Sequence, residues 1–223
     1  MRRVAATTFT ATIATTLLTL APTAIADTAG VVLRPGAKVT SRTAGGVGKG
    51  DCTAGFLARN RRGHPVLFSA GHCAHGDGSR LTMHADAGGE VPVAEFVVSE
   101  FEGAEGEATD IAVLKLANGV AATGKIDGRI PVSGWVSTVS EGDTVCKLGA
   151  VSGLDCGPVV EVSASKVKFA ASIQRGDSGG PVFVMRKDGT AAAVGIIIRM
   201  ARQRLLIAEL IGPWLGRWNL TVG

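Results

Sequence analysis

The apolar stretches of this chain are short, and residues that favour turns separate them. Glycine accounts for 31 of the 223 residues, and Asp, Asn or Ser lies beside many of these glycines, as at 76–79 and 188–189. Short runs rich in Val, Ile and Phe that are broken in this way are typical of β-strands joined by turns. The sequence therefore predicts an all-β fold, a sandwich or a barrel. Strands are expected at 55–58, 65–69, 91–98, 111–116, 159–162 and 181–184.

A single segment, 205–214, has the spacing of a helix instead. Leu206, Leu210 and Trp214 recur every four residues, which would place them on one helical face. Pro213 lacks a backbone N–H, so we expect this C-terminal helix to be short or bent.

Residues 1–26 have the composition of a secretory signal peptide. Arg2 and Arg3 precede an uncharged apolar and threonine-rich stretch, and Ala24-Ile25-Ala26 forms a small-residue cleavage signal. The alternative is a membrane anchor, but a bilayer span needs about 20 apolar residues, and this stretch is short and rich in threonine. We therefore expect a secreted protein, located outside the cell or in the cell envelope.

Charge and composition argue against several classes of function. The formal net charge is +4, and removal of Arg2 and Arg3 with the signal peptide leaves +2. Basic residues are dispersed apart from small groups at 59–62 and 199–204, which argues against a nucleic-acid partner. The glycines at 45–50 lack the ending of a phosphate-binding loop, and we expect no cofactor. No apolar run after the signal peptide is long enough to span a bilayer.

Four cysteines in an exported chain predict two disulfides, for which three pairings exist. We favour Cys52 with Cys73 and Cys146 with Cys156, because each pair joins neighbours in sequence and closes a modest loop. A metal site is the competing interpretation, since two histidines lie near Cys73. We disfavour a metal because the chain has no paired ligand spacing such as Cys-x-x-Cys.

Three short motifs contain candidate catalytic side chains. Ser178 lies in Gly-Asp-Ser-Gly-Gly-Pro, a glycine-rich turn whose backbone N–H groups can converge on an anion. His72 lies in Ser-Ala-Gly-His-Cys, and Asp110 lies in Thr-Asp-Ile-Ala-Val-Leu-Lys-Leu. A hydroxyl becomes a useful nucleophile when a neighbouring base takes its proton, and an imidazole oriented by a carboxylate is such a base. The three motifs together predict acyl transfer.

These motifs, in the order His72, Asp110, Ser178, resemble those of chymotrypsin-fold serine proteases. The resemblance extends from about residue 45 to the end of the chain. It is greatest with the secreted bacterial branch, which includes α-lytic protease and the streptogrisins. The loop between Cys146 and Cys156 also matches a disulfide loop of that branch.

The resemblance implies a domain organisation. It predicts two six-stranded antiparallel β-barrels with the active site between them and a short C-terminal helix. Residues 27–134 would contain an N-terminal segment and the first barrel, starting near residue 31, and 135–223 the second barrel and the helix. The stretch 134–140 would connect the two halves.

The resemblance also implies roles for the motif residues. Ser178 would be the nucleophile, His72 the general base, and Asp110 the carboxylate that orients the imidazole and stabilises its charged form. The backbone N–H groups of Gly176 and Ser178 would form the oxyanion hole.

A supporting pair is expected beneath the oxyanion turn. Bacterial relatives have an internal basic residue just after a cysteine, which pairs with the aspartate beside the serine. The corresponding residues here are Lys147 and Asp177, and Arg175 is the rival partner for the aspartate.

The chain departs from these relatives where a substrate would bind. Their strand after the serine ends in Ser-Gly-Gly, whereas this chain has Ile198, Arg199 and Met200 there, followed by a short loop. Side chains of that size could fill the specificity pocket. Ser172 would lie at the base of the pocket, where trypsin-like enzymes have aspartate, so the sequence gives no support for an Arg or Lys preference.

The sequence therefore predicts a secreted serine endopeptidase that acts on protein or peptide substrates as a monomer. The alternative is a binding module of the protease fold, catalytically weak or inactive, with an occluded pocket. An esterase-like hydrolase of small acyl groups is a third hypothesis. The three motifs favour an enzyme, and the bulky residues at 198–200 favour the binding module.

The other histidines and the tryptophans are expected outside the site. His64, His75 and His84 lack comparable sequence contexts and are predicted to be surface residues. Packing roles are predicted for Trp135, Trp214 and Trp218.

Overall fold

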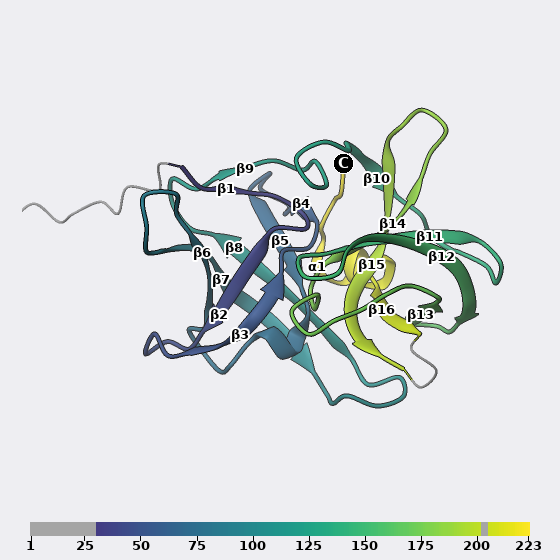
Figure 1. Cartoon of the computed structure of the whole chain (residues 1–223), viewed down its shortest axis with the longest axis horizontal. Helices are drawn as coiled ribbons and strands as arrows, with labels where there is room; N and C mark the ends of the chain where they lie inside the picture. The colour runs from purple at the N-terminus through teal and green to yellow at the C-terminus, as the bar shows by residue number, and fades with distance from the viewer. Residues whose placement is uncertain (1–29, 202–204) are drawn as a thin grey trace, which may run out of the picture.

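The protein consists of two β-barrels packed side by side, as the computed structural model in Figure 1 shows. The structure describes residues 30–201 and 205–223, so the predicted signal peptide lies outside the described residues. Within the described part of the chain, no helix has the length and apolar character needed to cross a bilayer.

The first barrel contains β2 (Lys38–Arg42), β3 (Gly48–Thr53), β4 (Leu57–Arg59), β5 (Pro65–Ser69), β6 (Arg80–His84), β7 (Glu90–Phe101) and β8 (Asp110–Leu116). The strand order is β3-β2-β6-β7-β8-β5-β4, and all neighbours are antiparallel. β3 and β4 are halves of one bent strand, because Gly55 donates to the Phe68 carbonyl and Phe68 donates to the Phe56 carbonyl across the bend. One half pairs with β2 and the other with β5, which closes a six-stranded barrel.

Glycine is required at the bend of this strand. A Cβ atom at Gly55 would lie 2.4 Å from the carbonyl oxygen of Phe68. Phe56, next to the bend, is fully buried. Fully buried residues elsewhere in the same sheet include Leu67, Phe68, Leu81, Val93, Ile111 and Leu114.

The second barrel contains β10 (Val132–Trp135), β11 (Thr144–Gly149), β12 (Gly153–Val162), β13 (Lys166–Phe169), β14 (Pro181–Met185), β15 (Ala191–Met200) and β16 (Leu206–Leu210). The strand order is β10-β15-β14-β11-β12-β13-β16, and a further pairing of β15 with β16 closes a six-stranded barrel. β10 is attached outside this ring, parallel to β15. The barrel interior includes Val145, Val159, Phe169, Val182, Ile197 and Leu206.

Short elements complete the fold. β1 (Val32–Leu33) and β9 (Ala121–Ala122) form a parallel pair, and the 3₁₀ turn η1 (Gly71–Cys73) follows β5. Helix α1 (Gly212–Trp218) lies near the C-terminus (Figure 1).

The predicted all-β architecture of two six-stranded barrels with a short C-terminal helix is confirmed. Each of the six strand segments expected from the sequence falls within or overlaps an observed strand. Both predicted disulfides are present, Cys52–Cys73 and Cys146–Cys156. Local β-propensity and turn residues sufficed for these strands because each is a short run bounded by turns.

The helix expected at 205–214 is wrong in its position. Leu206–Leu210 forms β16, which pairs with β13 on one side and β15 on the other. Two-sided pairing inside a barrel outweighs a four-residue spacing that would also suit a helix. The helix begins later, at Gly212, and Pro213 lies in its first turn, where its missing N–H removes no helical hydrogen bond.

The connection between the barrels also differs from the stretch expected at 134–140. Val132–Trp135 is strand β10, and it pairs with β15 of the second barrel. Pairing in the second sheet therefore begins before the predicted division at residue 134. The segment between β8 and β10, which includes β9, makes the crossing from one barrel to the other.

Each disulfide is expected to stabilise its barrel by about 3 kcal/mol through loss of unfolded-state entropy, and slightly more for the longer loop. The closed segments span 21 residues for Cys52–Cys73 and 10 for Cys146–Cys156. We expect the double alanine variant of the first pair to lose slightly more stability than that of the second. Urea unfolding of the two variants under matched conditions measures this. A larger loss for the shorter loop would contradict the entropic account.

Candidate active site

The turn that presents His72 is fixed on three sides. Gly71 lies so close to β7 that a Cβ atom there would be 2.4 Å from the Glu100 carbonyl oxygen. Ser99 of β7 donates a hydrogen bond of 2.9 Å to the Gly71 carbonyl. Cys73 is joined to Cys52 of β3 by a disulfide. The Ser-Ala-Gly-His-Cys motif thus gives a short turn with little freedom at the histidine.

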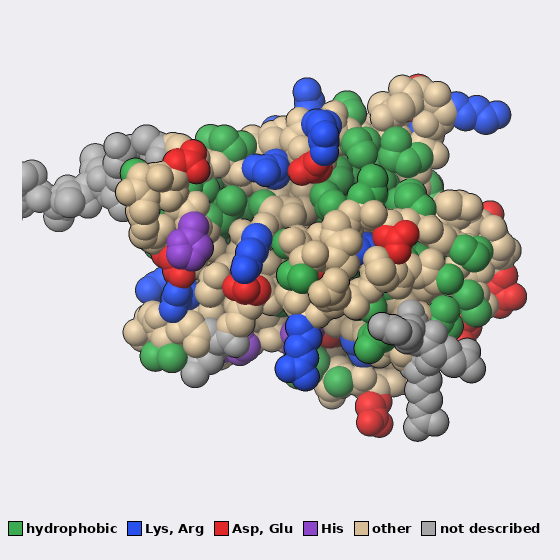
Figure 2. All heavy atoms as spheres, in the orientation of Figure 1, with side chains coloured by type: hydrophobic (Ala, Val, Ile, Leu, Met, Phe, Trp, Pro, Cys, Tyr) green, Lys and Arg blue, Asp and Glu red, His purple; other side chains and the backbone are tan. Residues whose placement is uncertain are grey.

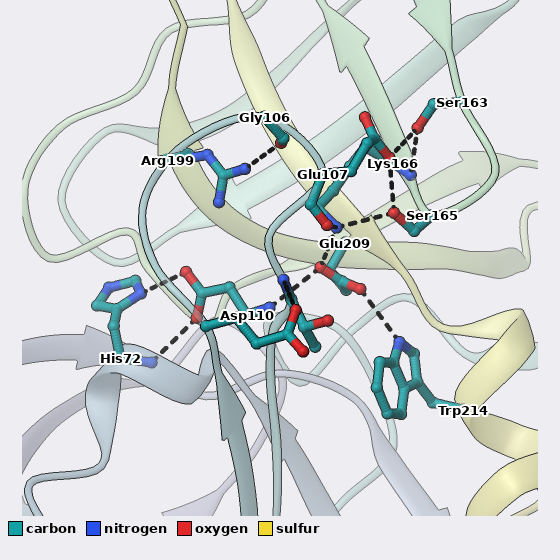
Figure 3. Close-up of polar contacts among 12 residues, drawn as sticks. His72, Gly106, Glu107, Asp110, Ser163, Ser165, Lys166, Arg199, Glu209 and Trp214 are labelled. Carbon is teal, nitrogen blue, oxygen red and sulfur yellow. Dashed lines mark hydrogen bonds and ion pairs between the residues drawn. The ribbon is translucent and has the colours of Figure 1, made fainter.

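His72 and Asp110 are bonded to one another by two contacts, shown in Figure 3. The ring Nδ1 of His72 lies 2.8 Å from Asp110 Oδ2, and the backbone N–H of His72 donates to Asp110 Oδ1 at 3.0 Å. The aspartate side chain is 2% exposed and that of the histidine is 31% exposed. A buried carboxylate therefore accepts from one ring nitrogen and favours the tautomer that leaves Nε2 free to take a proton.

Ser178 lies on the glycine-rich turn of the second barrel, next to the histidine turn of the first. Its carbonyl accepts from the backbone N–H of Thr53 at 2.7 Å. The same carbonyl oxygen lies 3.9 Å from Cys73 Sγ, one residue after His72. The hydrogen bonds among the described side chains do not include one from Ser178 to His72, and such contacts are often loose before a substrate binds.

Two amide groups of this turn have no acceptor among the described residues. The N–H groups of Asp177, Gly179 and Gly180 donate to the carbonyls of Gln174, Ile197 and Asp177. Within the described part of the chain, no acceptor is found for the N–H groups of Gly176 and Ser178. Amides left free beside a serine are the donors that an oxyanion hole requires.

The turn needs glycine for two separate reasons. Gly176 and Gly179 have φ angles of +101° and +87°, in the region that other residues rarely adopt. In addition, a Cβ atom at Gly179 would lie 2.5 Å from the Thr53 carbonyl oxygen. The motif glycines therefore give the turn its shape and let it approach the first barrel.

Thr53 connects this turn to the first barrel through its side chain as well as its backbone. Its Oγ1 donates to the Gly176 carbonyl at 2.7 Å and accepts from the Ala150 N–H at 2.9 Å. The side chain is fully buried. One threonine of β3 thus fixes both residues that carry the free amides.

Asp177 is fully buried beneath the turn and accepts four hydrogen bonds. Its Oδ1 accepts from the backbone N–H groups of Val151 and Ser152, each at 3.0 Å. Its Oδ2 accepts from the Gln174 N–H at 2.8 Å and from the Ser152 hydroxyl. Burial opposes ionisation of this carboxyl, but the hydrogen bonds outweigh it, so the pKa of Asp177 lies below its ordinary value.

Lys147 reaches Asp177 through Ser152 rather than by direct contact. Its Nζ donates to the Ser152 hydroxyl and, at 2.8 Å, to the Gly153 carbonyl. The lysine is fully buried, and burial lowers its pKa against the opposing charges of Asp177 and Asp155. The direct pair expected from the sequence is therefore replaced by a hydrogen-bonded chain of three residues, Lys147, Ser152 and Asp177. Arg175, the rival partner, is exposed and makes none of the four hydrogen bonds to the aspartate.

The four residues predicted to line the substrate cleft differ in their exposure to solvent. Ile198 is 2% exposed, whereas Met200 is 56% exposed. Arg199 reaches across to the other barrel, where its Nη2 donates to the Gly106 carbonyl at 2.6 Å. Ser172 is exposed. Met200 pairs with Leu206, and residues 202–204 between them lie outside the described residues.

The remaining histidines lie at the surface, and two of the three tryptophans pack together. His64, His75 and His84 are all exposed. Trp214 and Trp218 pack with ring centroids 4.6 Å apart, and Trp135 is 39% exposed. Among the described residues, no group of three or more His, Cys, Asp or Glu side chains is arranged to bind a metal ion.

Sequence reasoning missed several residues that contact the predicted site. Thr53, Ser152, Lys166 and Glu209 all bond to a motif residue or to one of its direct partners. None of them belongs to a recognisable local motif. Each becomes visible only when strands distant in sequence pair or pack.

The trypsin family model matches residues 37–203. This span is more than half of the chain, so the chain belongs to the trypsin family. An uncharacterized protein of Mycobacterium tuberculosis is 29% identical over 149 residues, which are 65% of this chain and 66% of that protein. The chain thus matches just under two thirds of the length of this relative.

Solved structures of bacterial proteases have the same fold. Nocardiopsis protease has a TM-score of 0.65 at 24% identity, covering 86% of this chain and 99% of that one. Thermobifida fusca protease A has a TM-score of 0.66 at 20% identity, covering 86% and 98%. An α-lytic protease homologue, N4, has a TM-score of 0.65 at 25% identity, covering 86% and 100%. The resemblance to bacterial chymotrypsin-fold serine proteases is confirmed, and it supports a hydrolase of the serine protease type.

Replacement of Thr53 tests whether its hydroxyl fixes the turn. Thr53→Val keeps the side-chain shape but leaves the half-buried Ala150 N–H unpaired, so we expect a loss of about 1–3 kcal/mol in unfolding free energy. Thr53→Ser keeps the hydroxyl and serves as the matched control. Urea denaturation of both variants gives the difference. Equal stability of the two would show that the hydroxyl contributes nothing.

Acidification tests the buried carboxylate of Asp177. Its folded-state pKa lies below the ordinary value of 3.8, so its stabilisation is complete above that pH and is lost as the pH falls through the folded value. We expect Asp177→Asn to cost about 3 kcal/mol near neutral pH and less at about pH 3. Urea unfolding of both proteins at the two pH values measures the difference. A difference independent of pH would contradict this account.

Proposed function

We propose that this protein is a secreted serine endopeptidase that uses His72, Asp110 and Ser178 as a catalytic triad. The observation that carries the proposal is the bonded pair of His72 Nδ1 and the buried Asp110 carboxylate, 2.8 Å apart. That pair orients the imidazole with Nε2 available as a base. The neighbouring serine turn and the family membership fit the same chemistry.

Acylation begins when the Ser178 hydroxyl attacks the carbonyl carbon of a peptide bond. His72 Nε2 takes the hydroxyl proton, and Asp110 stabilises the imidazolium that results. The carbonyl oxygen becomes an oxyanion, which accepts hydrogen bonds from the free N–H groups of Gly176 and Ser178. Loss of one such donor typically costs about 3 kcal/mol of transition-state stabilisation.

Collapse of this intermediate breaks the bond between the carbonyl carbon and the amide nitrogen. His72 gives its proton to that nitrogen, and the amine product leaves an ester on Ser178. A water molecule then attacks the ester carbonyl while His72 takes one of its protons. Return of this proton to the serine oxygen releases the carboxylic acid product and restores the enzyme.

Asp177 and Lys147 have supporting roles in this proposal. The Asp177 carboxylate binds the N–H of Gln174 on one side of the turn and the N–H groups of Val151 and Ser152 on the other. Lys147 neutralises part of its charge through Ser152. The arrangement keeps the turn in the shape that presents two amides, so no reorganisation is needed when the oxyanion forms.

Ser172, Ile198, Arg199 and Met200 are proposed to line the substrate cleft. Arg199 bridges from β15 to Gly106 at 2.6 Å and so crosses between the barrels on this side of the proposed cleft. Met200 is exposed and therefore accessible to a substrate. Peptide segments in extended conformation suit such a cleft, because the end of β15 can pair with another strand.

Secretion is proposed from the first 26 residues and from the two disulfides, which form in oxidising compartments. A monomer acting on protein or peptide substrates fits the described chain. On the face shown in Figure 2, basic and acidic side chains are interspersed, which is unlike a nucleic-acid-binding surface.

A fluorophosphonate probe tests the proposed nucleophile directly, because it reacts with activated serines. We expect the oxidised protein without residues 1–26 to be labelled, and Ser178→Ala to remain unlabelled. Ser172→Ala is the matched control, since this exposed serine of the cleft should not react. Mass spectrometry of the labelled peptide identifies the site.

Unlabelled native protein from the same preparation would then be assayed with peptide libraries and small esters. Cleavage of peptides supports the endopeptidase, whereas turnover of esters alone would replace it with the esterase. No labelling of the folded native protein would favour the non-catalytic binding module. Labelling of Ser178→Ala at the native rate would exclude Ser178 as the nucleophile.

A further inference from the structure

A buried ion pair lies directly behind Asp110, and the proposed chemistry does not use it. Lys166 Nζ of β13 and Glu209 Oε2 of β16 are 2.7 Å apart, and both side chains are 1% exposed. Figure 3 shows Glu209 between Asp110 and Trp214 of α1, and Lys166 beside Ser165. Both charged residues belong to the second barrel, whereas Asp110 belongs to the first.

Glu209 bonds across the interface between the barrels. Its Oε2 accepts from the backbone N–H of Asp110 at 3.3 Å, in addition to the lysine. Its other oxygen, Oε1, accepts from Trp214 Nε1 at 3.2 Å. The carboxylate is therefore held by two groups of its own barrel while it binds the backbone of the residue that orients His72.

Lys166 extends the same contact to the segment before Asp110. Its Nζ donates to the Glu107 carbonyl at 3.3 Å and to Ser165 Oγ at 2.9 Å. The Glu107 carboxylate in turn accepts from Ser163 Oγ at 2.7 Å and from Ser165 Oγ at 2.8 Å. The second barrel thus binds the first barrel at Glu107 and at Asp110, on both sides of residues 108 and 109.

Stability alone gives a poor reason for this arrangement. Burial raises the pKa of the Glu209 carboxyl against the favourable effect of Lys166, so the ionised pair is costly to bury. Apolar residues of similar volume are often as stable or more stable in place of such a pair. A directional contact to Asp110 is what the apolar replacement could not provide.

We propose that Glu209, fixed by Lys166 and Trp214, is a positioning residue that sets Asp110, and through it His72, relative to Ser178. This inference rests on the proposed function. The reacting groups come from different barrels, and a misplacement of about 1 Å can reduce a reaction rate by about 100-fold. The bond from Glu209 to Asp110 joins the barrel that carries the nucleophile to the backbone of the residue that orients the base.

The test compares two variants in which the Lys166–Glu209 pair is replaced by uncharged residues. The variants differ in one hydrogen-bond acceptor at position 209. Lys166→Met/Glu209→Gln/Trp214→Phe retains an amide oxygen for the Asp110 N–H, and Lys166→Met/Glu209→Met/Trp214→Phe does not. Trp214 is replaced in both so that the indole N–H does not compete for that oxygen. Neither variant leaves one member of the Lys166–Glu209 pair buried without its partner, a change that would by itself destabilise the fold.

The measurement is the second-order rate of fluorophosphonate labelling, with urea unfolding as the measure of stability. We expect the glutamine variant to react within about threefold of the native rate and the methionine variant to react about 10-fold or more slowly. Equal rates for the two variants would overturn the inference and leave the proposed function intact.

Two further measurements cover the other outcomes. If the methionine variant does not fold, Glu209→Asp retains the charge but withdraws the carboxylate by one methylene, and native-rate labelling of it would overturn the inference. If the native protein is not labelled, the proposed function fails, and His72 is titrated by NMR in the same variants. A titration midpoint that moves in the methionine variant alone would support positioning of the pair, and unchanged midpoints would overturn it.

Discussion

The residues proposed to react come from two separate barrels, so their geometry depends on a few hydrogen bonds across the interface between the barrels. Apolar packing brings the barrels together but has no direction. Direction comes from Thr53, which binds the carbonyls of Gly176 and Ser178, and from Glu209, which binds the Asp110 N–H. One contact aligns the serine turn with the first barrel, and the other aligns the aspartate with the second.

Both sides of the site are supported by a buried lysine and a buried carboxylate. Lys147 and Asp177 act through Ser152 beneath the serine turn, and Lys166 and Glu209 form a direct pair behind Asp110. Burial of such charges costs free energy that apolar packing would not. In each case the carboxylate binds at least one backbone N–H group, which a hydrophobic side chain cannot do. Both carboxylates therefore orient backbone segments.

Much of the fold could be predicted from the sequence because its signals are local. Each motif residue lies in a short strand or turn, and Gly176 and Gly179 beside Ser178 allow the positive φ angles of its turn. Cys146 and Cys156 are ten positions apart on paired strands, so their pairing followed from proximity. The segment at 206–210 was assigned wrongly because its conformation depends on two partner strands rather than on its own spacing.

The sequence by itself determined the fold class, the disulfides and the three motifs, because strand runs, turn glycines and short cysteine spacings act over a few residues. Only the tertiary structure decided that Ser152 joins Lys147 to Asp177, that Arg199 reaches Gly106, and that Glu209 binds Asp110. These contacts join residues on different strands or in different barrels. Their geometry is set by how the second barrel folds and how the two barrels pack, and no local pattern encodes either.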